Sequence, residues 1–116
     1  MASQYTTISS EEMRDFLKLE KGWKEETQGN ELVFSYNLRD FPFIQIKVYS
    51  SIRLDTQIGR KVGADAIRVC AVNTKTNAGW IKSSRVYRVL GWKDNLKERV
   101  CQVIRDAEKR LQPWRA

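Results

Sequence analysis

The chain has 116 residues, enough for one domain spanning residues 1–116 with one modest hydrophobic core. A composition of 41% hydrophobic and 30% charged residues, with a net charge of +7, is that of a globular protein and argues against disorder throughout. Histidine is absent and no apolar run approaches the ~20 residues of a membrane span, so we expect a non-enzymatic cytoplasmic protein without cofactor, metal or membrane contact.

The first predicted element is a helix from about Ser10 to Lys21. Ser9 and Glu12 have the spacing of a capping box at its start. Gly22 is a natural residue to end it, because glycine adopts the left-handed conformation at little cost. Residues 1–8, before the helix, are predicted to be a flexible segment.

Three strands are predicted next, at about Trp23–Thr27, Glu31–Leu38 and residues 43–53. The third alternates most clearly, because Ile44, Ile46 and Val48 fall on one face. Its opposite face carries two aromatic and two basic side chains, Phe43, Lys47, Tyr49 and Arg53. That second face must meet solvent, another layer or a ligand.

Two more strands are predicted at about Ala66–Thr74 and Ser84–Trp92, followed by a helix at about Asp94–Leu111 with one apolar stripe. Loops at 54–65 and 75–82 connect the strands. The order of elements predicts an α+β fold. It consists of an antiparallel sheet of about five strands, with the N-terminal and C-terminal helices packed on one face.

Basic residues are concentrated in the second half of the chain. Residues 1–58 contain seven Lys/Arg and nine Asp/Glu, whereas residues 59–116 contain fourteen and five. Clustered charge favours a negatively charged partner, through long-range attraction and counterion release. A solvated basic surface that only aids solubility is the alternative.

The sheet face left uncovered by the helices is the first candidate site. Unpaired bases stack on aromatic rings while neighbouring cations contact phosphates, which is how sheets bind single strands. The residues expected there or beside it are Lys47, Tyr49, Arg53, Arg68, Arg85, Tyr87 and Arg88. The alternation in the fifth strand leaves open which of its residues share this face. Ordinary cross-strand packing, or a dimer contact, is the alternative for the aromatic residues.

Further candidates lie in the loops and at the start of the last helix. Arg60 and Lys61 sit between two glycines that let a backbone approach a phosphate. Trp80, near Lys82, is either packed on the core or exposed as a contact residue. Lys93 directly follows the basic fifth strand.

These residues predict a non-catalytic nucleic-acid-binding domain, with single-stranded DNA or RNA favoured, acting as a monomer or homodimer. The alternative is a protein-interaction module docking on an acidic protein surface. A lesser alternative is a metal-dependent nuclease, because Asp40, Gln45 and Lys47 partly resemble the arrangement in restriction-type nucleases. Cys70 and Cys101 are predicted to be reduced and buried.

Overall fold

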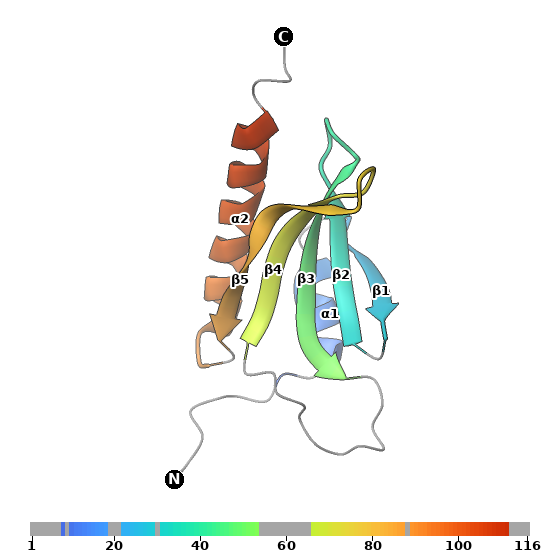
Figure 1. Cartoon of the computed structure of the whole chain (residues 1–116). Coiled ribbons are helices and arrows are strands. Elements are labelled where there is room, and N and C mark those ends of the chain that lie inside the picture. The colour runs from blue at the N-terminus through green and yellow to red at the C-terminus, as the bar shows by residue number, and fades with distance from the viewer. Residues whose placement is uncertain are drawn as a thin grey trace.

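The computed structural model describes residues 8, 10–18, 22–29, 31–53, 66–87 and 89–111. Within them, the elements in chain order are α1 (Ser10–Lys18), β1 (Lys24–Gln28), β2 (Glu31–Asn37), β3 (Ile44–Arg53), β4 (Ala66–Asn73), β5 (Ala78–Tyr87) and α2 (Trp92–Leu111). The strands form one antiparallel sheet in the order β1-β2-β3-β4-β5 (Figure 1). The predicted α+β class with a five-stranded antiparallel sheet is confirmed.

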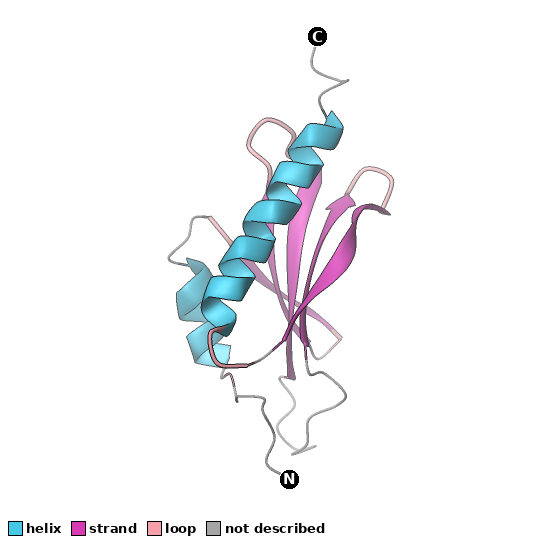
Figure 2. Cartoon of the chain, turned by 90° about the vertical axis from the view of Figure 1, so that its left-hand side faces the viewer, coloured by secondary structure: helices cyan, strands magenta, loops and turns pink. Residues whose placement is uncertain are grey.

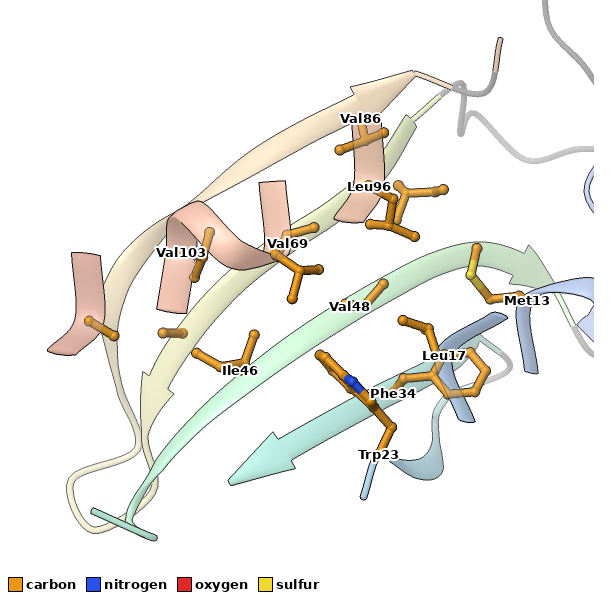
Figure 3. Packing of buried hydrophobic residues seen from close by; sticks show 14 of the residues in the cluster. Met13, Leu17, Trp23, Phe34, Ile46, Val48, Val69, Val86, Leu96 and Val103 are labelled. Atoms are coloured by element: carbon orange, nitrogen blue, oxygen red, sulfur yellow. The ribbon is translucent and has the colours of Figure 1, made fainter. Parts of the chain in front are cut away.

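The core lies against one set of alternating strand residues. Ile44, Ile46 and Val48 of β3 are fully buried, as their alternation predicts, and Val48 lies opposite Phe34 on β2 and Val69 on β4. The same cluster contains side chains from both helices, including Met13, Leu17, Leu96 and Val103 (Figure 3). Each such aliphatic side chain contributes about 1.5–3 kcal/mol on full burial.

The N-terminal helix is described over Ser10–Lys18, as predicted, and residues 19–21 of the predicted helix lie outside the described residues. Ser9, the expected cap, lies outside the described residues. Ile8 closes the segment expected to be flexible, yet its side chain is only 4% exposed and belongs to the core cluster. Gly22, which follows the predicted helix, has a φ of +45°. The chain therefore contributes to the core from residue 8 onward.

The fifth strand begins and ends earlier than predicted. It spans Ala78–Tyr87 rather than 84–92, and the expected loop 75–82 is instead a turn at residues 74–77. The Asn73 side-chain oxygen accepts hydrogen bonds from the backbone amides of Lys75 and Thr76, at 2.9 and 3.4 Å. Such a turn closes a tight hairpin. Pairing between β4 and β5 therefore resumes at Ala78.

Trp92, expected at the end of a strand, is instead the first residue of α2. Gly91 has a φ of +89°, and the Trp92 amide donates to the Val89 carbonyl at 3.0 Å. This turn buries the indole, whose ring meets Phe16 of α1 edge-on with centroids 5.7 Å apart. From there α2 contacts β5, β4 and β3 (Figure 2).

Neither described helix is long and apolar enough to cross a membrane.

Candidate nucleic-acid interface

The register of the sheet brings three predicted residues into one row. Tyr49 lies opposite Arg68, and Arg68 lies opposite Arg85. Directly opposed residues share a face of an antiparallel sheet, and this row alternates with the core residues Val48 and Val69. We use the name outer face for the sheet surface carrying Lys47, Tyr49, Arg68, Cys70, Arg85 and Tyr87.

Arg68 lies at the centre of the outer face. Its guanidinium carbon is 4.4 Å from the centroid of the Tyr49 ring, a cation–π contact. Its Nη2 atom is 3.7 Å from a carboxylate oxygen of Glu31 on β2. The Arg68 side chain is nevertheless 47% exposed, so the guanidinium can still meet a ligand.

Lys47 is held more tightly by an acid. Its ammonium nitrogen lies 2.9 Å from a carboxylate oxygen of Glu26 on β1, and only 14% of the side chain is exposed. A phosphate would have to displace Glu26 to reach it. The prediction places Lys47 on the outer face correctly, but the structure couples its charge to the first half of the chain.

Cys70 is buried beside these two cations, since it lies directly opposite Lys47 in the register. Burial raises the pKa of its thiol, and the positive charges of Arg68 and Lys47 offset part of that increase. Both cysteines are free thiols. Cys101, however, is exposed on α2, so the prediction that both cysteines are buried is wrong for Cys101. Cys101 is not one of the buried residues that form the apolar stripe of this helix.

The end of β5 presents one basic and one aromatic side chain. Val86 is buried in the core, which places Arg85 and Tyr87 together on the outer face. Tyr87 is 49% exposed. Arg85 is exposed and makes no ion pair with a described residue. Arg85 and Tyr87 therefore combine a free cation with an accessible ring.

Lys82 lies where the register between β4 and β5 shifts. Val69 pairs with Ser84 and Ala71 with Ile81, so two β5 residues, Lys82 and Ser83, lie opposite Cys70. Lys82 is exposed and, within the described ranges, forms no ion pair. It extends the basic surface of the β4–β5 hairpin.

Trp80 packs against α2 and is not brought to the outer face. Its indole N–H donates to the Ala107 carbonyl at 3.4 Å. The guanidinium of Arg110 lies over the ring at 4.8 Å and donates to the Trp80 carbonyl. A second register shift, between Ala71 and Val72, makes Trp80 an extra residue in β5. The sequence left open whether Trp80 is packed on the core or exposed as a contact residue, and in the structure it is packed.

Two other predicted contact residues also have partners elsewhere. Phe43 lies in the turn before β3, where it packs edge-on against Phe41 and beneath the Lys75 ammonium at 4.5 Å. Lys93 lies 3.6 Å from Glu12, so it links α2 to α1. The remaining predicted residues lie outside the part of the chain whose side chains are described: Arg53, Arg60, Lys61 and Arg88.

Charge is distributed unevenly across the sheet. Residues 66–87, which form β4, β5 and their turn, contain four Lys/Arg and no Asp/Glu. Residues 24–37, which form β1, β2 and their turn, contain one Lys and three Glu.

No group of three or more His, Cys, Asp or Glu side chains that could hold a metal occurs among the described residues.

Sequence reasoning missed one feature, a groove of about 450 Å³ between β5 and α2. Arg85 and Tyr87 line it from the strand, and Asn95, Glu98 and Arg99 line it from the helix. The signal available in the sequence was a polar row on α2, with the i, i+3, i+4 spacing of one helix face.

No protein-family model, curated protein or solved structure matches this chain.

Proposed function

We propose that this protein is a non-catalytic domain that binds single-stranded nucleic acid on the β4–β5 half of the outer face. The observation that carries the proposal is the row of Arg68 and Arg85 beside the half-exposed ring of Tyr87. This row belongs to a hairpin with no acidic residue. The proposal takes both helices to cover the opposite face, which leaves this one free for a ligand.

The chemistry of these side chains suits an unpaired strand. Guanidinium groups donate to phosphate oxygens, and a tyrosine ring stacks on a base of any sequence. In a duplex the base faces are already stacked inside the helix, so Tyr87 would have no partner. Single strands are therefore favoured over duplexes.

The acidic residues of the sheet define where the strand would lie. Glu26 and Glu31, on β1 and β2, flank the outer face and would repel phosphates. A strand running along β4 and β5 instead meets Arg68, Lys82 and Arg85. The salt slope is the slope of the logarithm of the binding constant against the logarithm of the salt concentration. Each phosphate contact to a single strand adds about −0.7 to this slope, so three contacts predict a slope of about −2.

The test is a salt titration of oligonucleotide binding. Fluorescence anisotropy of a labelled oligothymidine, measured from about 50 to 200 mM salt, should give that slope. A duplex competitor should displace the label less effectively than an unlabelled single strand, and RNA and DNA forms are compared in the same assay. Absent binding at low salt, or binding indifferent to salt, would reject the proposal.

A second candidate, a module docking on an acidic protein surface, is favoured by one observation. Leu90 is 95% exposed two residues before the buried Trp92, and a fully exposed leucine can anchor a contact with another protein. A partner retained from nuclease-treated lysate by the wild type and lost by Leu90→Glu would favour this function. Oligonucleotide binding unaffected by Leu90→Glu would favour the first.

A further inference from the structure

The groove between β5 and α2 adjoins the proposed path of the strand. Arg85 and Tyr87 line the groove and also belong to the outer face, because β5 is the edge strand of the sheet next to α2 (Figure 1). A nucleic-acid strand lying over β4 and β5 therefore passes the mouth of the groove. A volume of about 450 Å³ is within the range of small-ligand sites.

The lining of the groove differs in chemistry from the outer face. The β4–β5 half of the outer face offers cations, whereas the groove also contains the carboxylate of Glu98 and the amide of Asn95. Glu98 and Arg99 are exposed on α2, and neither makes an ion pair with a described residue. A purely anionic ligand such as a phosphate would be repelled by Glu98. The groove suits a ligand whose edge carries donors and acceptors side by side.

Gln102, at the far end of this polar row, is already engaged. Its side-chain amide donates to Asp106 at 2.8 Å, and its oxygen accepts from Arg105 at 3.0 Å. The other polar side chains of the lining are Glu98, Arg99 and Asn95 from the helix and Arg85 and Tyr87 from the strand.

We propose that this groove binds an unpaired guanine base of the single strand, an inference that rests on the proposed function. Guanine presents two neighbouring N–H donors, at N1 and N2, to the two oxygens of a carboxylate such as Glu98. Its O6 and N7 atoms accept from a guanidinium, the commonest specific contact to this base. The exposed ring of Tyr87 provides a stacking surface at the same groove.

The other bases match the lining less well. Thymine and uracil have a single ring N–H and no amino group, so one carboxylate oxygen of Glu98 would lose its partner. Adenine and cytosine each offer one amino group but no adjacent ring N–H. Sites that hydrogen-bond a particular edge discriminate because a mismatch leaves polar groups unpaired.

The experiment compares two labelled oligonucleotides that differ at one position. Anisotropy is measured for an oligothymidine and for the same oligomer with one central guanine, with the full-length protein. We expect the guanine-containing oligomer to bind about tenfold more tightly, from one bidentate pair. Glu98→Gln should reduce this difference, because only the guanidinium contact to O6 and N7 remains intact. It should leave the affinity for oligothymidine within about twofold, because only one exposed charge changes.

Glu108→Gln is the matched control, since it removes the same charge from an exposed position of the same helix that does not line the groove. It should keep the guanine preference. Salt-dependent oligothymidine binding without guanine preference, or a guanine preference that Glu98→Gln does not reduce, overturns the groove assignment alone. Failure of both oligomers to bind overturns the proposed function and this inference with it.

Discussion

The two sides of the sheet differ in how their charged residues are used. On the β1–β2 side every described glutamate of the strands has a basic partner: Glu25 pairs with Arg14, Glu26 with Lys47, and Glu31 with Arg68. On the β4–β5 side, Lys82 and Arg85 pair with no described acid. A count of basic residues therefore overestimates the charge available to a ligand, and the register decides which cations remain free.

The largest expected effect comes from reversing charge on the β4–β5 side. Arg68→Glu with Arg85→Glu removes two phosphate contacts and adds repulsion, so we expect oligonucleotide affinity to fall about a hundredfold or more at low salt. Lys18→Glu with Lys109→Glu makes the same change in net charge at exposed helical positions and should cost far less. Equal losses in the two double variants would mean that net charge, rather than this surface, drives binding.

Replacing the exposed ring should have the next largest effect. Tyr87→Ala removes a stacking surface and should weaken oligothymidine binding about tenfold, in the range of 1–3 kcal/mol per stacked base. Tyr49→Ala should cost less, because the Tyr49 ring is already covered by Arg68. Anisotropy of both variants, with Tyr87→Phe as the control that keeps the ring, measures the difference. A larger loss of affinity from Tyr49→Ala than from Tyr87→Ala would contradict the stacking role of Tyr87.

Releasing a paired cation on the β1–β2 side should raise oligonucleotide affinity, whereas the preceding substitutions lower it. Glu26→Gln frees the Lys47 ammonium and removes a negative charge from the outer face. Affinity should rise about two- to fivefold, and the salt slope should steepen by about 0.7. The measurement is the same salt titration.

Glu25→Gln is the matched control for that variant, because it makes the same chemical change at the neighbouring residue but releases Arg14 of α1. It should leave the slope unchanged. If Glu25→Gln and Glu26→Gln behave alike, Lys47 is not reached by the strand.

The smallest expected effect concerns the Cys70 thiol, which belongs to the outer face but is buried there. Burial raises the pKa of Cys70 above its ordinary value of 9.0, so the folded protein holds this proton more tightly than the unfolded chain. Its contribution to stability is present below pH 9 and is lost as pH rises through the folded-state pKa. Urea unfolding between pH 8 and pH 10 should show a shallower loss of stability for Cys70→Ala than for the wild type.

The sequence predicted β3 well because one of its faces is buried. Ile44, Ile46 and Val48 alternate with Lys47 and Tyr49, and a sheet with one covered face imposes that period of two. The placement of Lys47 and Tyr49 on the outer face followed directly.

The fifth strand was misplaced because its register shifts twice. Trp80 is an extra residue in β5, and Lys82 and Ser83 together face one residue of β4. These shifts interrupt the alternation from Ala78 onward, whereas the run ending at Trp92 alternates as a strand would. A period-based interpretation therefore starts the strand too late and continues it into α2.

The ion pairs of the outer face could not be predicted from the sequence. Lys47 and Glu26 are 21 residues apart and lie on different strands. Their meeting depends on the pairing of β1 with β2 and of β2 with β3, which no local pattern specifies. The groove beside α2 likewise depends on how the helix lies against β5.

The edge strand β1 bears on how copies of this protein can meet. It has five residues, four of them exposed, and includes Lys24, Glu25 and Glu26. Short, charged edges are poor templates for the backbone of another chain. Copies of this protein brought close together would therefore touch at this edge through side chains, and a continuous intermolecular ladder would not grow from β1.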